Sequence, residues 1–240
     1  LVSAFEKVIT YCFLTDWILK KCLRNQSKFF LVQTFFGVKY KACFDSMCLE
    51  KRKYIMSQKL SRSTIRLTGS PSIVGSAAVG GKKEGEGPLA RYFDILCDDS
   101  TLGEQTWEKA ESRLQKDAVN KALEKSCLST TDIDFLFAGD LLNQCISSTY
   151  GLRDLEIPFL GVYGACSTMA ESLALASLFV DNGIAVHAAA VTSSHFCAAE
   201  RQFRLPLEYG GQRTPTSQWT ATASGAAVVA SGDKGPFVKE

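Results

Sequence analysis

The sequence lacks the long apolar run that a membrane-spanning helix needs. About 18 consecutive apolar residues are required, and the best stretch near the N-terminus, residues 29–38, is shorter and contains Gln33. Residues 1–25 have scattered charges and no small-residue cleavage site after an apolar run, so they lack the pattern of a secretory signal. We therefore expect a cytoplasmic protein.

Metal-binding patterns are also scarce. The chain has only two histidines, His187 and His195, and its nine cysteines include no C-x-x-C pair. Cysteines of a cytoplasmic protein stay reduced, and this set fits neither a disulfide framework nor a zinc site. We expect no bound metal and no cofactor. The net charge of +2 gives no reason to expect a nucleic-acid partner.

Charge is unevenly distributed along the chain. Residues 1–55 contain ten Lys and Arg against four Asp and Glu, whereas residues 56–240 contain seventeen against twenty-one. We therefore divide the chain into an irregular basic extension, 1–55, and a domain, 56–240, that starts at Met56. Our hypothesis is that the extension is translated upstream sequence or an unusual addition. The alternative is a native basic tail that lies on an anionic surface.

The remaining sequence alternates between strand patterns and helix patterns. The helix pattern is clearest where Trp107, Ala110, Leu114 and Ala118 fall near one face, with charged residues elsewhere. The predicted elements are a strand and glycine-rich loop at 69–88, a helix at 104–126, strands at 132–140 and 157–163, a helix at 168–181, strands at 185–193 and 220–231, and an ordered loop at 199–212. This order predicts a layered α/β fold with right-handed crossovers.

The clearest chemical feature is Cys166, between a predicted buried strand and an alanine-rich helix. A helix N-terminus favours a thiolate there, Gly164 and Ala165 leave room for a ligand, and Ser167 or Thr168 can cap the helix. The same position suits an exposed nucleophile. The alternative is a small buried residue, which is the usual environment of a free cysteine.

The partners that Cys166 would need are less distinct. His195 follows a strand, where parallel sheets bind ligands, whereas His187 lies inside the predicted strand as a core residue. Arg201, Arg204 and Arg213 are suited to a dicarboxylate ligand, because guanidinium groups pair with carboxylates in a bidentate way. Internal salt bridges of these arginines to Glu200 and Glu208 are the alternative.

Several segments together resemble the SpoVAD family of sporulation proteins, within the thiolase-like superfamily. They are 83–89 (KEGEGPL), 138–144 (AGDLLNQ), 164–168 (GACST), 192–195 (TSSH), 199–204 (AERQFR) and 208–212 (EYGGQ). Their order and spacing hold over residues 65–232. The GACS segment alone would indicate only the wider thiolase and ketoacyl-synthase superfamily.

The resemblance implies the N-terminal βαβαβαββ half of a thiolase-like fold, with a mixed five-stranded sheet flanked by helices. It implies a sporulation protein that binds dipicolinic acid, an aromatic dicarboxylate, or its calcium chelate, and supports its uptake into the developing spore. Other SpoVA membrane proteins would be its partners, at the forespore or spore inner membrane. The expected ligand-binding residues are Cys166, at the superfamily's nucleophile position, with Ser167, Asp140, His195, Arg201 and Arg204.

The sequence departs from the superfamily because it matches only the first half. The histidine or asparagine partners of a catalytic cysteine come from the second half, which argues against turnover. Two alternatives stay open: a thiolase-like acyltransferase using Cys166, and a non-functional truncated copy. We also expect a homodimer, and a sheet face left uncovered where the second half would pack.

Overall fold

The computed structural model describes residues 57–203, 216, 220–232 and 235–240. The predictions made for residues 1–55, for Arg204 and for Arg213 lie outside these residues. No helix within the described ranges combines the length and apolar character needed to cross a bilayer.

Strands and helices alternate along the described chain. The strands are β1 (Gln58–Lys59), β2 (Ile65–Arg66), β3 (Pro71–Gly80), β4 (Ile95–Leu96), β5 (Phe135–Gly139), β6 (Phe159–Gly161), β7 (His187–Ser194) and β8 (Ala223–Ser231). The helices are α3 (Lys82–Gly85), α4 (Trp107–Ser126), α5 (Ile146–Leu152), α6 (Thr168–Asp181) and α7 (Phe196–Phe203). Short 3₁₀ turns cover Ala90–Tyr92, Thr130–Asp132, Asn143–Cys145, Arg153–Leu155 and Ala165–Ser167.

The main sheet has the order β4-β3-β8-β7-β5-β6. Strands β5, β6 and β7 pair in parallel, as do β3 and β4, and β8 runs antiparallel to both of its neighbours, β3 and β7. The α/β class and the mixed sheet flanked by helices are therefore confirmed. The two-residue edge strand β4 makes the sheet six-stranded instead of the expected five-stranded.

One local prediction was wrong, and one helix was missed. Residues 196–203 form α7, although 199–212 were expected to be a loop. Buried Ala198 and Ala199 give this segment the apolar side that a short helix needs. Helix α5 was not expected, because Ile146–Leu152 is short and has serine and glycine within it.

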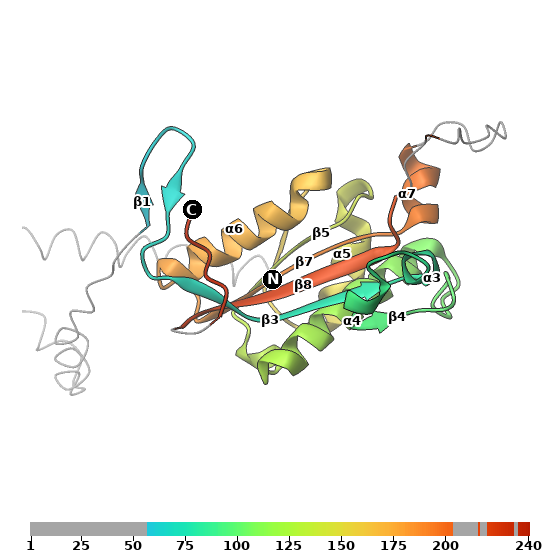
Figure 1. The fold of residues 1–240 in the computed structure, drawn as a ribbon, viewed down its shortest axis with the longest axis horizontal. Coiled ribbons are helices and arrows are strands. Elements are labelled where there is room, and N and C mark those ends of the chain that lie inside the picture. The colour runs from blue at the N-terminus through green and yellow to red at the C-terminus, as the bar shows by residue number, and fades with distance from the viewer. Residues whose placement is uncertain (1–56, 204–215, 217–219, 233–234) are drawn as a thin grey trace, which may run out of the picture. The chain divides into compact units, whose positions relative to one another are not determined.

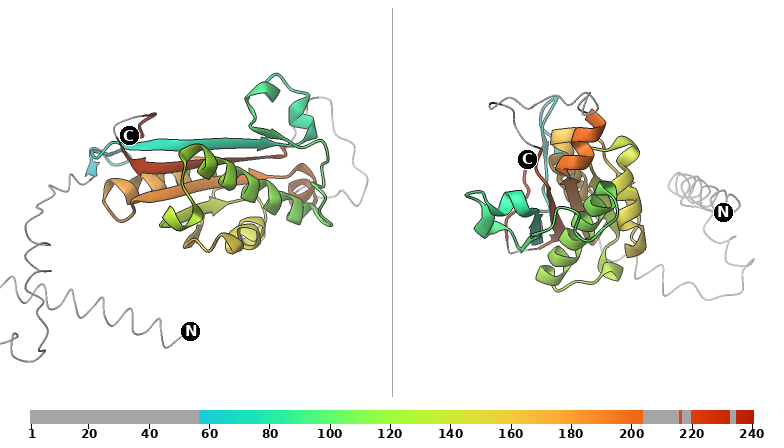
Figure 2. Two further views of the ribbon diagram at one scale, coloured as in Figure 1. Left: turned by 90° about the horizontal axis from the view of Figure 1, so that it is seen from below. Right: turned by 90° about the vertical axis from the view of Figure 1, so that its right-hand side faces the viewer.

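Each face of the sheet is covered by a helix. Neighbouring residues of one strand point to opposite faces, so they contact different helices. Leu136 and Ala138 belong to the core cluster with α4, whereas Phe137 belongs to the cluster with α6. Helices α4 and α6 accordingly lie on opposite sides of the sheet (Figure 1), and α5 lies beside α4 (Figure 2). The expectation of an uncovered sheet face was wrong. The outer side of α6 carries the exposed residues Ala170 and Ala174.

Helix α4 has defined ends. The hydroxyl of Thr106 accepts a hydrogen bond from the Lys109 N–H at 3.3 Å, which caps the first turn. Cys127 follows the last turn with a φ of 57°, in the left-handed conformation that often ends a helix. These two features set where α4 begins and where it ends.

Candidate functional site

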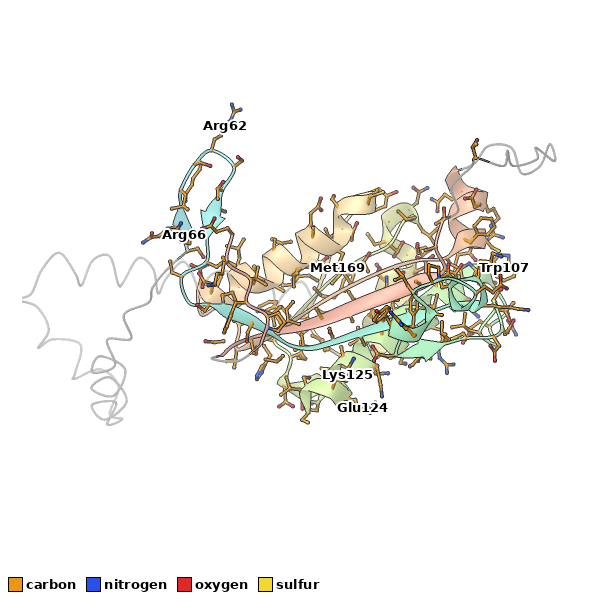
Figure 3. The ribbon with its side chains drawn as sticks, viewed as in Figure 1. Arg62, Arg66, Trp107, Glu124, Lys125 and Met169 are labelled. Atoms are coloured by element: carbon orange, nitrogen blue, oxygen red, sulfur yellow. The ribbon has the colours of Figure 1, made fainter. Side chains whose placement is uncertain are left out.

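The candidate site lies at the carboxyl ends of strands β3, β5, β6 and β7. Because these strands run in the same direction, their carboxyl ends meet there, as in other α/β sheets that bind ligands. Helix α7 and Trp107 lie at this end of the sheet, and the β1–β2 hairpin lies at the other (Figure 3).

Cys166 is exposed at this edge. It lies in the 3₁₀ turn Ala165–Ser167, which leads directly into α6. The Ser167 hydroxyl donates to the Gly164 carbonyl at 2.7 Å and also contacts the Glu171 carboxylate. The buried alternative is therefore excluded, and Cys166 and Ser167 are both open to solvent.

The turn is held against the end of β5. Thr168 is buried, and its hydroxyl accepts a hydrogen bond from the Gly164 N–H at 3.2 Å. A Cβ on Gly139 would lie 2.0 Å from the Val162 carbonyl oxygen and 2.6 Å from Thr168 Cγ2. Only glycine allows this close approach, so Gly139 fixes the position from which α6 starts.

Asp140 follows β5 and is 1% exposed. One carboxylate oxygen accepts from the Leu142 N–H at 2.8 Å, and the other accepts from the Ser148 N–H at 2.8 Å and the Ser148 hydroxyl at 2.6 Å. These bonds join the end of β5 to α5. The carboxylate is thus used within the fold, and the expectation that Asp140 binds a ligand stays a prediction.

A buried polar network continues from Ser148 to α4. The Gln115 side-chain nitrogen donates to the Ser148 hydroxyl at 2.9 Å, to the Ser193 hydroxyl at 2.8 Å and to the Gly139 carbonyl at 3.0 Å. The Ser193 hydroxyl in turn donates to Glu111 Oε1 at 2.8 Å. Asp140, Ser148, Gln115, Ser193 and Glu111 thus join α4, α5, β5 and β7, and we call them the polar network.

Glu111 is the unusual member of the polar network. It is fully buried on α4, and burial raises the pKa of its carboxyl to about 8, with the nearby Asp140 charge acting in the same direction. Hydrogen bonds from Ser193 and the His195 backbone act against this rise. A carboxyl with such a pKa is predominantly protonated at neutral pH.

His195 is fully buried, and its ring is hydrogen-bonded within the fold. Its Nδ1 accepts from the Cys197 N–H at 3.2 Å, so its hydrogen is on Nε2, which donates to the Ser100 carbonyl at 2.8 Å. The ring also packs on Trp107, with centroids 5.4 Å apart. Burial lowers the pKa of His195 and keeps it neutral. The expectation that His195 binds a ligand stays a prediction, although both ring nitrogens are hydrogen-bonded within the fold.

Arg201 is exposed on α7 and forms an ion pair with Glu108 of α4. Neither expected acidic partner, Glu200 or Glu208, is its partner in this pair. His187 is the first residue of β7, so it lies at the amino end of the strand, opposite the candidate site. Its Nδ1 lies 3.0 Å from the Asp132 carbonyl oxygen.

The six expected site residues therefore separate into groups. Cys166 and Ser167 are accessible, Asp140 and His195 are buried supports, Arg201 is paired, and Arg204 is outside the described residues. A groove of about 700 Å³ lies elsewhere, lined by α4, α5 and the turn that follows α5. Its lining includes Lys109, Arg113, Lys116, Tyr150 and Arg153. Over the described ranges, no cluster of His, Cys, Asp and Glu could hold a metal ion.

Sequence reasoning missed Glu111 and Gln115. Both directly follow residues of the apolar stripe, Ala110 and Leu114, and lie one helical turn apart. The sequence signal that could have identified them is an acid and an amide at this spacing, directly beside an apolar stripe.

Comparison with known proteins identifies related sequences. A family model described as Stage V sporulation protein AD (SpoVAD) matches residues 61–240. The chain is 51% identical over 160 residues to the stage V sporulation protein AD of Bacillus subtilis (strain 168), covering 66% of this chain and 47% of the relative. The chain thus spans about half the length of this relative.

Solved structures with a similar fold are more distant. The 3-oxoacyl-[acyl-carrier-protein] synthase III of Aquifex aeolicus VF5 is 16% identical with a TM-score of 0.48, over 68% of this chain and 55% of the synthase. The priming β-ketosynthase of the R1128 polyketide pathway is 15% identical with a TM-score of 0.45, over 74% of this chain and 54% of the ketosynthase. These likenesses concern the fold and carry no information on activity.

Proposed function

Because this chain belongs to the stage V sporulation protein AD family, we propose that it binds dipicolinic acid and supports its uptake into the developing spore. The observation that supports this most is the exposed Cys166 turn within the matched region, at the carboxyl edge of the sheet. Ligands of α/β proteins bind at this edge.

The start of α6 offers part of the chemistry that a dicarboxylate needs. A helix N-terminus carries partial positive charge, which attracts carboxylates. Ala165 and Ser167, the neighbours of Cys166, are small and exposed, which would allow a flat aromatic ring to reach the thiol. The thiol and the Ser167 hydroxyl would then contact the ligand directly.

Glu171 would favour the calcium chelate over the dipicolinate dianion without calcium. Its exposed carboxylate contacts Ser167, one turn into α6, and would repel a ligand with two negative charges. A calcium ion carried by the ligand would offset that repulsion, because calcium prefers oxygen ligands such as carboxylates. The proposed ligand is therefore calcium dipicolinate.

Acyl transfer through Cys166 is the second candidate, favoured by the exposed thiol at a helix start. It would need a base close to the thiol. Of the two histidines, both within the described chain, His195 is buried with both nitrogens bonded and His187 lies at the opposite edge. Incubation with acyl-coenzyme A and mass analysis of Cys166 tests this candidate, and a thiol that stays unmodified argues against it.

We place the protein at the forespore or spore inner membrane as a peripheral homodimer associated with other SpoVA membrane proteins. Family membership supports this location. Light scattering on the purified chain tests the dimer. Detergent-free flotation with membranes, from cells with and without those partners, tests the association.

Calorimetric titration of the 240-residue chain with dipicolinate, with and without calcium, tests the proposed ligand. We expect saturable binding that calcium strengthens, and Glu171→Gln should reduce the dependence on calcium. An absence of heat with a folded chain under both conditions would overturn the proposal.

A further inference from the structure

Two buried oxygen atoms in the polar network lack a hydrogen-bond donor. They are Glu111 Oε2 and Gln115 Oε1, and both side chains are 0% exposed. The two residues are one turn apart on α4, so their side chains lie on one face. A buried acceptor without a donor is costly, which makes this pair an anomaly in an otherwise well-bonded region.

The neighbouring donors are already in use. The Ser193 hydroxyl donates to the other oxygen of Glu111, the His195 backbone also bonds the Glu111 carboxyl, and the two hydrogens of the Gln115 nitrogen are shared among three acceptors, including the Gly139 carbonyl. Turning the Gln115 amide over would point its oxygen at that carbonyl and lose the bond. The amide orientation is therefore fixed, and each of the two oxygens still lacks a hydrogen between itself and a neighbouring acceptor or donor.

We propose that Glu111 is a neutral carboxylic acid whose hydrogen, on Oε2, is donated to the Gln115 amide oxygen, and that this proton positions the turn carrying Cys166. A single proton gives both unpaired oxygens a partner. It also keeps a negative charge out of a site that is closed to water.

The charges around Glu111 are consistent with a neutral acid. Asp140 faces it from the end of β5 and is itself acidic. Helix α7 contributes Glu200 and Arg201, and Arg201 pairs with Glu108 in the preceding turn of α4. Strands β3 and β8 and helix α5 contain no charged residue. Among the described residues, no Lys or Arg forms an ion pair with Glu111.

A chain of contacts leads from this proton to the candidate site. Gln115 donates to the Gly139 carbonyl at 3.0 Å, and Gly139 packs so closely on Thr168 that a Cβ would lie 2.6 Å from its methyl carbon. Thr168 follows Cys166 by two residues. Glu111 is therefore a positioning residue. Loss of its proton would put a buried charge on Glu111 and leave the Gln115 amide oxygen without a donor, and we expect the bond from Gln115 to the Gly139 carbonyl, and with it the turn, to shift.

Carbon-13 NMR of glutamate side-chain carboxyls in the full chain tests the proton directly. The Glu111 signal, identified by its absence in Glu111→Gln and its displacement in Glu111→Asp, should be that of a protonated acid at pH 7 and should titrate near pH 8. Glu108→Gln, on the same helix, should leave the signal in place. A carboxylate signal at pH 6 would overturn the proposal. If Glu111→Gln does not fold, Glu111→Asp still assigns the signal.

Dipicolinate affinity tests the positioning role, which rests on the proposed function. At pH 9, about one unit above the pKa of Glu111, only about a tenth of wild-type molecules keep the proton, so their affinity should fall about tenfold relative to Glu111→Gln. A constant ratio between pH 7 and 9 would overturn the positioning role. If neither protein binds dipicolinate in the presence of calcium, the proposed function fails, and the NMR titration still decides whether Glu111 holds the proton.

Discussion

Ser148 donates two hydrogen bonds to one oxygen of Asp140, from its N–H at 2.8 Å and from its hydroxyl at 2.6 Å. This pair joins the end of β5 to α5, and Gln115 extends it to α4. A family motif residue that sequence reasoning associated with a ligand is thus part of the support beneath the site. Substitution of a supporting residue should therefore lower the stability of the fold, whereas substitution of a ligand-binding residue should lower affinity for the ligand.

Asp140→Asn should destabilise the fold. The amide keeps the size of the carboxyl but presents a donor to at least one of the three donors now facing it, which costs about 2–3 kcal/mol. Urea unfolding at neutral pH measures the loss. Asp154→Asn is the control, because its side chain is 61% exposed, and it should change stability by no more than about 1 kcal/mol. Equal effects of the two substitutions would contradict the supporting role.

Gly139→Ala should be among the most disruptive small substitutions in the sheet. The new Cβ would lie 2.0 Å from the Val162 carbonyl oxygen, so the backbone before the Cys166 turn must move. We expect a loss of about 2–3 kcal/mol in thermal or urea unfolding. Gly225→Ala in β8 is the matched control, since its Cβ would meet nothing within 4 Å, and it should stay within about 0.5 kcal/mol of the wild type. Tolerance of both changes would show that the turn is not held as described.

His195 should make folding sensitive to mild acid. Burial lowers its pKa below the ordinary value of 6.5, so the folded state excludes the proton that the unfolded state accepts. Its contribution to stability is complete above pH 6.5 and is lost as the pH falls below it. His195→Gln should remove this slope from the stability profile, and His187→Gln should leave it unchanged. A slope that persists in His195→Gln would assign the effect to another group.

Glu111 should make the folded state less stable as the pH rises, which is opposite to the pH dependence expected from His195. Its folded-state pKa of about 8 exceeds the ordinary value of 4.5, so its stabilising contribution is complete below pH 4.5 and is lost as the pH rises to 8. The corresponding difference in unfolding free energy between wild type and Glu111→Gln should change by at most about 5 kcal/mol over this interval. A difference that is flat with pH would mean that Glu111 ionises normally in the folded state.

The architecture could be predicted because periodicity is local. Helix α6 begins and ends where the alanine-rich pattern indicated, at Thr168 and Asp181, and β7 begins at His187, within two residues of its predicted start. Helix α7 gives only a weak local signal, because it has eight residues and two buried alanines, Ala198 and Ala199, supply its apolar side.

The polar network could not be predicted, because its partners are distant in sequence. Gln115 meets Ser148 and Ser193 across separations of 33 and 78 residues. The sequence placed the charged residues of α4 on its outer face, whereas Glu111 is fully buried. Similarly, nothing local indicated that Arg201 pairs with Glu108, 93 residues earlier.

The most direct test of the central claim is protection of Cys166 from alkylation by calcium dipicolinate, followed by peptide mass analysis of the full chain. Cys127, also exposed but at the far end of α4, is the internal control. Binding at the Cys166 turn predicts that Cys166 reacts more slowly in proportion to ligand occupancy, while Cys127 reacts at an unchanged rate. If calorimetry shows saturation and Cys166 still reacts at its original rate, the ligand binds elsewhere and the site proposed for it is wrong.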